Sequence, residues 1–315
     1  MYDTCYFFIQ RVRQDDFQNI VGCLTGARET TDTATGEVLA TVGSLNNMKV
    51  SVSMAGLSVK GSLCKFYLPD NTFTLSRNTT KDALTKLSDS LHIDFDEAKL
   101  TRIDVSTHFI MSKPAPTYYP FLGLCTHYQR TQATAHTLYY NNMAKDLQRT
   151  MVFYDKLPEV EARDGITPDV FVGENLLRYE SRWVRRLPQQ LRVSEVKGRT
   201  LYDATFYHYI IDLWAKNYFS IQKIKKQKNE SMNEIKDVKS AANYIISVAL
   251  QRLPPDEVQN LLEEMKAKRV FRDAKYYTRL RQKLKNITTN SKMSNESDQI
   301  RELDNEVKQI LAYKV

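Results

Sequence analysis

The chain has 315 residues, of which 42% are hydrophobic and 26% are charged. This composition fits one large or two ordinary globular domains, and it excludes a disordered chain, a collagen-like fibre and a disulfide-rich miniprotein. The formal net charge of +8 favours an anionic partner, with nucleic acid ahead of an acidic membrane surface.

The cysteine spacing and the hydropathy narrow the class of protein further. The four cysteines lie far apart without a Cys-x-x-Cys pair, which argues against a disulfide framework and a structural zinc site. The N-terminal apolar run has no basic segment before it and no small-residue cleavage site after it. No apolar stretch approaches the ~18 residues of a membrane span. We therefore expect a protein of a reducing cytoplasm, with no membrane partner.

Short alternating segments with intervening glycines dominate the first 200 residues and predict strands. One helix is predicted over residues 80–92, where Ala83, Leu84, Leu87 and Leu91 form an apolar stripe. The predicted strands cover residues 3–12, 36–43, 48–54, 57–63, 100–111, 137–140, 150–154 and 176–184. This order indicates an α+β domain over residues 1–200, with a largely antiparallel sheet and helices packed on it.

Helical periodicity replaces alternation after residue 200. We predict an all-helical basic region over residues 201–287, with helices at 202–224, 238–250, 256–268 and 271–287. Residues 288–315 should form a polar linker and then an amphipathic helix over 300–311, whose apolar stripe is available to a partner.

The surplus positive charge is concentrated in this helical region. Residues 216–285 hold 17 Lys and Arg against 8 Asp and Glu. A charged helical face can simply be solvated. The concentration of positive charge in a region that follows a nearly neutral sheet domain in the sequence instead favours DNA binding. The stretch FRDAKYYTRLRQKLK mixes aromatic and basic side chains, which suits phosphate contact and base stacking. Lys275, Arg279 and Arg281 are the candidate DNA contacts there.

The segment TRIDVSTHFI places polar groups on one face of a strand. Residues two apart share a face, so Asp104, Ser106 and His108 point the same way. A carboxylate and an imidazole are suitable ligands for a divalent metal ion. Two other interpretations stay open: an exposed sheet face, or a buried pair between Asp104 and Arg102.

The segment RTMVFYDK brings a tyrosine close to a lysine. Tyrosines on strands usually belong to the core or its rim, but Lys156 lies two residues from Tyr154. A phenol with a pKa near ~10 is a poor nucleophile at neutral pH, and a nearby ammonium group or metal ion would stabilise its phenolate.

The segment LLRYESRWV carries a glutamate between two arginines. Arg178, Glu180 and Arg182 share one face of the predicted strand. They form either an ion-paired strand face or a second metal carboxylate flanked by guanidinium groups for a phosphate backbone.

In this order and spacing the three segments resemble the gene II/X family of phage and plasmid replication proteins, which includes the filamentous-phage gene II rolling-circle initiators. The family pattern is matched by Arg102-Ile103-Asp104, by the run from Arg149 to Lys156 and by Arg178-Tyr179-Glu180-Ser181-Arg182. The opening Met1-Tyr2-Asp3 is also similar. The resemblance covers roughly residues 1–220, and the basic helical tail more loosely.

The resemblance implies a rolling-circle replication initiator, a metal-dependent endonuclease and strand transferase that nicks DNA at the origin and later rejoins it without ATP. It makes Tyr154 the nucleophile and Lys156 its cationic neighbour. Asp104 and Glu180 would hold Mg²⁺ or Mn²⁺, and we add His108 on strand geometry alone. Arg149, Arg178 and Arg182 are candidate DNA contacts. The implied partners are origin DNA, single-stranded or supercoiled, and a helicase and polymerase of the bacterial host.

Two features leave alternatives open. Many rolling-circle initiators carry two metal-binding histidines around one hydrophobic residue, and this chain has no such pair. Tyr202, Tyr207 and Tyr209 follow soon after the glutamate segment and are alternative nucleophiles. The chain lacks a Gly-x-x-x-x-Gly-Lys-Ser/Thr loop, in agreement with a separate helicase. The runner-up function is a non-catalytic origin-binding or regulatory DNA-binding protein.

Overall fold

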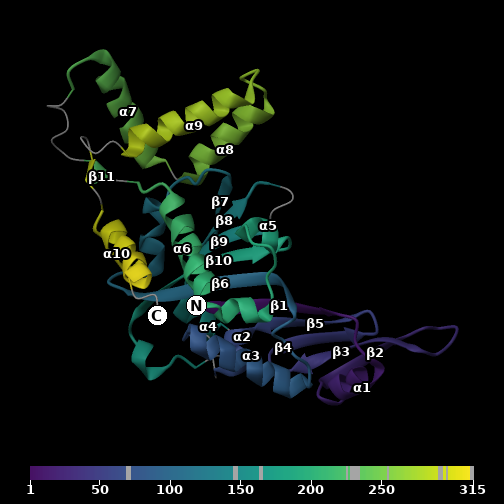
Figure 1. Cartoon of the computed structure of the whole chain (residues 1–315). Helices are drawn as coiled ribbons and strands as arrows, with labels where there is room; N and C mark the ends of the chain where they lie inside the picture. Colours follow the sequence, from purple (N-terminus) through teal and green to yellow (C-terminus); the bar gives the residue numbers. More distant parts are fainter. Residues whose placement is uncertain are drawn as a thin grey trace.

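The computed structural model of the chain describes residues 1–68, 72–144, 148–162, 166–224, 226–227, 235–253, 255–289, 294–295 and 297–312. Its centre is one ten-stranded sheet with the strand order β2-β3-β4-β5-β1-β6-β10-β9-β8-β7, in which every pairing is antiparallel (Figure 1). The strands are β1 (Tyr2–Gln10), β2 (Thr25–Thr31), β3 (Val38–Leu45), β4 (Met48–Ser53), β5 (Gly56–Ser62), β6 (Lys99–Met111), β7 (Tyr128–Thr134), β8 (Thr137–Asn142), β9 (Gln148–Asp155) and β10 (Asn175–Val184).

The helices are short in the first half of the chain and longer toward its end. They are α1 (Gln14–Gly22), α2 (Leu63–Tyr67), α3 (Arg77–Leu91), α4 (Lys156–Glu161), α5 (Leu187–Leu191), α6 (Ala204–Ser220), α7 (Val238–Arg252), α8 (Pro255–Ala267), α9 (Ala274–Thr289) and α10 (Asp298–Ala312). In the part of the chain that the structure describes, 3-10 helices cover Ala115–Thr117, Tyr119–Phe121, Asp169–Phe171 and Gly198–Tyr202, and β11 (Lys226–Gln227) pairs with β12 (Ser294–Asn295). No helix of the described residues is long and apolar enough to cross a membrane.

Helix α6 packs on one face of the sheet through aromatic side chains. The ring of Tyr179 on β10 lies 4.9 Å from that of Trp214 on α6 and stacks on Phe153 of β9 at 4.5 Å. Large aromatic groups bury much apolar area, and such pairs add about 0.5–1.5 kcal/mol beyond it. Because side chains alternate along a strand, Arg178 and Glu180 on either side of Tyr179 point away from α6.

The last helix folds back onto the same core. Ile300, Leu303 and Val307 of α10 are buried together with α6 and the sheet. The hydroxyl of Tyr218 on α6 donates to Asp304 at 2.6 Å. The apolar stripe of α10, which we expected to be available to a partner, is thus covered by the rest of the chain. The core of the sheet domain therefore includes α6 and α10, the helices before α7 and after α9 in the sequence.

Helices α7, α8 and α9 form a group beside the β7 edge of the sheet (Figure 1). A buried arginine joins them to the sheet, because Arg130 on β7 pairs with Asp256 of α8 at 2.5 Å. The same guanidinium donates to the carbonyl oxygens of Leu122 and Tyr119.

The α+β fold class, the antiparallel sheet and the helical C-terminal region are confirmed. Every predicted strand and helix is present, with ends that differ by a few residues. The pattern of alternating polar and apolar residues did not predict α1, β2, α2, β7 or the short helices α4 and α5, which follow β9 and β10. All residues of β2 are exposed, so this edge strand carries no alternation between core and solvent. Part of the expected linker, residues 290–293 and 296, lies outside the described residues.

Candidate active site

The sheet register brings the three sequence segments together on neighbouring strands. On β10, Arg178 pairs with His108 of β6 and with Tyr154 of β9. Four residues further along β10, Arg182 pairs with Asp104 of β6. Directly paired residues point to the same side of a sheet, so the predicted shared faces of these strands are confirmed, on the side opposite α6.

A cavity of about 350 Å³ opens on this face. It is lined by Asp3, Thr4, Asn47, Ser62, Lys65, Arg102, Asp104, Tyr154, Glu159, Glu180 and Arg182. Four of the predicted site residues, Asp104, Tyr154, Glu180 and Arg182, therefore line the same hollow although they come from three strands.

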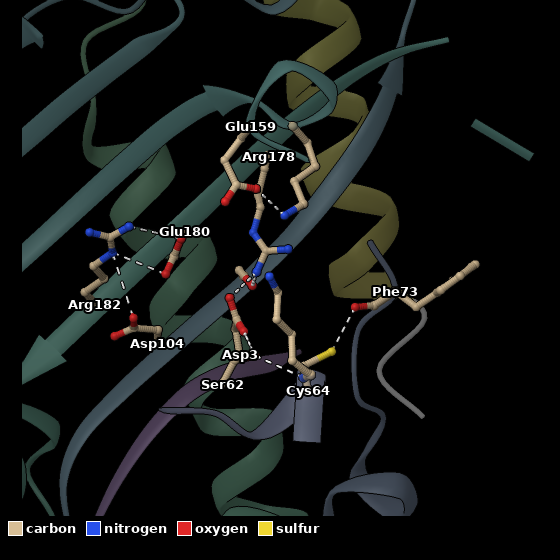
Figure 2. Close-up of polar contacts among 12 residues, drawn as sticks. Asp3, Ser62, Cys64, Phe73, Asp104, Glu159, Arg178, Glu180 and Arg182 are labelled. Carbon is tan, nitrogen blue, oxygen red and sulfur yellow. Dashed lines mark hydrogen bonds and ion pairs between the residues drawn. The ribbon is translucent and has the colours of Figure 1, made fainter. Parts of the chain in front are cut away.

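Two buried carboxylates lie next to each other and share one guanidinium. The side chains of Asp104 and Glu180 are 1% and 3% exposed. The Nε of Arg182 lies 3.2 Å from Oε1 of Glu180 and 3.9 Å from Oδ2 of Asp104 (Figure 2). Arg102 donates two hydrogen bonds to Asp104, at 2.8 and 2.5 Å. The pair of Asp104 with Arg102, one of the open interpretations, is thus present.

Burial raises the pKa of Asp104 above its ordinary value, and the neighbouring Glu180 carboxylate raises it further. The hydrogen bonds from Arg102 act in the opposite direction and favour the ionised form. Positive charge at this position therefore favours the ionised form of the buried Asp104 carboxylate.

The donor set fits a divalent cation of the magnesium type. Mg²⁺ is usually bound by one or two carboxylates, with waters and substrate phosphates as the other ligands. Asp104 and Glu180 offer these two carboxylates, and a cation there would compensate the buried charges that Arg182 compensates in the structure. Within the described residues, no group of three or more His, Cys, Asp or Glu side chains is placed to hold a metal ion.

Tyr154 is half-buried at the wall of the cavity. Burial raises its pKa above the ordinary value, the positive charge of Arg178 lowers it, and the carboxylates of Glu180 and Asp3 raise it. The phenol is thus protonated at neutral pH, and Arg178 is a cation that favours its ionisation.

Arg178 is held away from the protein surface. Its side chain is 1% exposed, and Nη2 donates to Oδ2 of Asp3 at 2.5 Å and to Oγ of Ser106 at 2.6 Å. The Asp3 carboxylate also accepts from the Ser62 hydroxyl (Figure 2). Arg178 was predicted as a DNA contact, but its position is that of a buried charge behind the cavity wall.

Lys156 is the first residue of α4 and is completely buried. Its ammonium group donates to Glu159 at 2.6 Å, and burial lowers its pKa. Lys156 is not among the residues that line the cavity. The structure therefore places it behind Glu159, which does line the cavity.

Two further predicted residues lie beside the cavity. The ring of His108 packs edge-on against Phe171 at 5.3 Å, and His108 is not among the lining residues. Arg149 donates to the side chain and the carbonyl of Gln190, both at 3.3 Å, and lines a neighbouring cavity. The structure does not bring His108 to the Asp104–Glu180 pair.

The three alternative tyrosines lie on the helical side of the sheet. Tyr202 donates to Asp96 at 2.6 Å, and Tyr209 donates to the carbonyl of Leu191 at 2.8 Å. Tyr207 on α6 is 4% exposed and packs against the ring of Tyr2. None of the three lines the cavity that holds Tyr154.

The basic candidates on α9 divide into two groups. Lys275 and Arg279 lie over the ring of the exposed Tyr276, at 5.5 and 5.6 Å. Arg281 instead pairs with Glu263 of α8 at 3.0 Å. A cation–aromatic cluster at the surface suits a nucleic acid strand, whereas the Arg281 pair joins two helices.

Residues far apart in sequence complete the cavity. Asp3, Lys65 and Glu159 lie outside the residues that we had singled out for the site. The opening Met1-Tyr2-Asp3, which is part of the family resemblance, was the available signal for Asp3.

Comparison with known families agrees with the geometry. The family model that describes the N-terminal part of the phage replication-associated protein, the gene II protein, matches residues 29–201. This range contains β3 to β10, the last three residues of β2, and every cavity residue except Asp3 and Thr4. A search of curated proteins finds no match to the chain.

Proposed function

Because the chain belongs to this phage family of replication-associated proteins of the gene II type, we propose that it starts rolling-circle replication by cutting one DNA strand at the origin. Membership of the family supports the role of replication initiator. The finer proposal is a metal-assisted nick with Tyr154 as nucleophile, followed by rejoining of the strand.

The observation that carries this proposal is the shared cavity. Tyr154 from β9, Asp104 from β6, and Glu180 and Arg182 from β10 all line it. A nicking enzyme needs a nucleophile, charge neutralisation and a phosphate-sized hollow in one place. A protein that only binds DNA has no need for a tyrosine beside two buried carboxylates.

The reaction is a transesterification at phosphorus. The Tyr154 hydroxyl loses its proton and attacks the scissile phosphate, while the bond from phosphorus to the 3′ oxygen breaks. That oxygen takes up a proton and becomes the 3′-OH primer, and the 5′ phosphate stays on Tyr154. The phosphotyrosyl ester retains the energy of the broken bond, so the reverse attack by a 3′-OH rejoins the strand without ATP.

Each residue of the cavity has a defined part in this scheme. Arg178 provides a fixed positive charge behind Tyr154 and favours its phenolate. Arg182, which is partly exposed, can turn to a phosphate oxygen. Asp104 and Glu180 would hold Mg²⁺ or Mn²⁺, which supplies Lewis-acid polarisation of the phosphate when bound.

The basic helix α9 supports the DNA-binding part of the proposal. Helix α9 lies at the end of the molecule beyond the β7 edge (Figure 1). Its exposed Lys275 and Arg279 flank Tyr276. The proposal includes a host helicase and polymerase as partners, in the cytoplasm of a bacterial cell, because the chain has no nucleotide-binding loop of its own.

A nicking assay tests the proposal. Purified protein is mixed with its own supercoiled replicon and Mg²⁺ or Mn²⁺, treated with protease, and analysed for open circles with a protein-blocked 5′ end. Tyr154→Phe should abolish the product. Tyr139→Phe is the matched control, because Tyr139 on β8 pairs with Val152 of β9 and is not among the cavity residues.

Each outcome decides between functions. Blocked 5′ ends that disappear only in Tyr154→Phe support the proposed reaction and its nucleophile. Nicking that survives in Tyr154→Phe would refute that nucleophile and direct attention to Tyr202, Tyr207 and Tyr209. A salt-sensitive gel shift without any nicking would favour the runner-up, a non-catalytic origin-binding protein.

A further inference from the structure

A second cavity of about 490 Å³ adjoins the candidate active site on the same side of the sheet. It is lined by Arg102, Asn141, Asn142, Met143, Ala144, Gln148, Arg149, Thr150, Arg182 and Val184. Arg102 and Arg182 line both cavities. The two hollows therefore meet at two guanidinium groups, which lie beside the Asp104–Glu180 pair.

The two cavities differ in chemistry. Four carboxylates, those of Asp3, Asp104, Glu159 and Glu180, line the first one. None of the described residues that line the second cavity is acidic, and three of them carry side-chain amides. We call this second cavity the amide groove. The guanidinium groups of Arg102 and Arg182 and the three amides make it a site for a negatively charged ligand with hydrogen-bonding edges.

The amide side chains come from the two neighbouring strands β8 and β9. Asn141 on β8 pairs with Thr150 on β9, and the Thr150 hydroxyl donates to the Asn141 side chain at 3.1 Å. Gln148 at the start of β9 pairs with Val184 of β10. Asn141 and Gln148 are both exposed. Amide side chains are the groups that pair with base edges in a bidentate way, most often with adenine.

We propose that the amide groove holds the nucleotides on one side of the scissile phosphate as single-stranded DNA and reads their bases. This inference rests on the proposed function. The volume of the amide groove, about 490 Å³, lies within the ~300–1,000 Å³ of pockets for single small molecules and suits one or two unstacked nucleotides. Bases of a single strand expose the hydrogen-bonding edges that pairing would hide.

The junction of the cavities fits this arrangement. Arg102 and Arg182 lie where the phosphate between the read nucleotides and Tyr154 would pass. Arg149 borders the groove but pairs with Trp183 of β10, and its guanidinium donates to Gln190 of α5. Backbone phosphates therefore meet the guanidinium groups of Arg102 and Arg182 at the junction, while bases meet the amides of the groove. The exposed amides thus determine which sequence is cut, and the buried residues of the first cavity carry out the cut.

The test uses binding rather than cleavage, so that it does not depend on the nucleophile. Full-length protein with Tyr154→Phe selects from a pool of single-stranded oligodeoxynucleotides with a random segment of twelve positions, and the bound fraction is sequenced. The same selection is made with Asn141→Ala and Gln148→Ala added. We expect the Tyr154→Phe protein to enrich a sequence motif. The added substitutions should reduce the enrichment at least fivefold at one to three adjacent positions of that motif.

A charge variant provides a second measurement. Gln148→Glu puts a carboxylate into the groove at an exposed position and should weaken binding of the selected oligonucleotide at least fivefold. Gln132→Glu on β7 is the matched control, because Gln132 is also exposed and lines neither cavity. It should change binding less than twofold.

Three results would overturn the inference. These are an unchanged motif after removal of both amides, equal effects of the two charge variants, and no single-stranded binding by the Tyr154→Phe protein. Each of these three results is compatible with a wild-type chain that nicks its replicon. Conversely, a motif that depends on Asn141 and Gln148 can be observed even if the chain does not nick DNA. Failure of the inference and failure of the proposed function are therefore distinguishable.

Discussion

Arg178 and Tyr154 lie directly opposite each other on the neighbouring strands β10 and β9. Side chains in such pairs have Cβ atoms about 4.5–5.5 Å apart. Asp3 and Ser106 hold the guanidinium of Arg178 in place. A fixed positive charge thus stands beside the candidate nucleophile, in the role that we expected for Lys156.

The Arg178–Asp3 pair should be critical for stability, because each charge is buried with the other. Replacing Arg178 with Gln leaves the Asp3 carboxylate without its main counter-charge and should lower the free energy of unfolding by about 3–5 kcal/mol. Adding Asp3→Asn should recover part of this loss. Urea denaturation of the single and double variants at pH 7 measures the coupling, and strictly additive effects would contradict the buried pair.

The rate of nicking should rise with pH. Burial raises the pKa of Tyr154 above its ordinary value, so the phenolate fraction grows up to about tenfold per pH unit through the neutral range. The single-turnover rate of covalent adduct formation, measured from pH 6.5 to 8.5 at saturating Mn²⁺, should increase accordingly. A rate that is independent of pH would show that loss of the phenol proton does not limit the reaction.

Removal of the divalent ion should abolish nicking, and the carboxylate pair should determine its affinity. Chelation with EDTA should stop the reaction, and Mn²⁺ should restore it. Asp104→Asn and Glu180→Gln should each weaken Mn²⁺ binding at least about tenfold, as measured by calorimetry. Glu159→Gln makes the same chemical change in the same cavity but at the carboxylate that pairs with Lys156. An equal loss in that control would refute the assigned metal pair.

The basic face of α9 should contribute salt-dependent affinity. Lys275→Ala and Arg279→Ala should weaken binding of single-stranded DNA, and each should reduce the slope of log affinity against log salt by about 0.7 for every phosphate that the side chain no longer neutralises. Arg281→Ala should change the slope less, because its guanidinium pairs with Glu263. Fluorescence anisotropy over a series of salt concentrations is the measurement, and equal slopes for all four proteins would contradict the assignment.

Lys223 should make the stability depend on pH above neutrality. Burial lowers its pKa from 10.5 to about 7, and Nζ donates to the carbonyl of Tyr218 at 2.9 Å. Between these two values the folded chain holds Lys223 neutral while the unfolded chain holds it protonated. Unfolding therefore takes up a proton, and the free energy of unfolding rises with pH by at most about 1.4 kcal/mol per unit.

Urea denaturation at pH 7, 8 and 9 measures this slope. Lys223→Met should flatten it, since no titrating group then remains at the position. The control is Lys216→Met, because Lys216 is an exposed residue of α6. A slope that persists in Lys223→Met would assign the pH dependence to another group.

Much of the candidate site follows from periodicity along single strands. Alternation predicted that Arg178, Glu180 and Arg182 share a face, and the register confirms it. The order and spacing of the three segments then carried the family resemblance, which supplied the expected roles of their residues. Alternation gives only the side of a strand on which a residue lies, and this is sufficient where one side is core and the other is not.

The periodicity along a strand could not predict which of its side chains are buried by other segments that pack on the same face of the sheet. Arg178 and Arg182 are equivalent in the pattern, but Asp3 from β1 buries the first and the cavity exposes part of the second. His108 shares a face with Asp104, but Phe171 covers it. These outcomes depend on β1 and on the segment before β10, which lie far from the motifs in sequence.

By itself the sequence determined the fold class, most strands and the faces of the three motif strands, because backbone geometry ties side-chain direction to a local period of two. Only the tertiary structure decided that Arg178 rather than Lys156 stands beside Tyr154, that Asp3 joins the site and that α10 packs on its own chain. Those relationships are contacts between distant segments, and they are selected by close packing of the whole core rather than by any local preference.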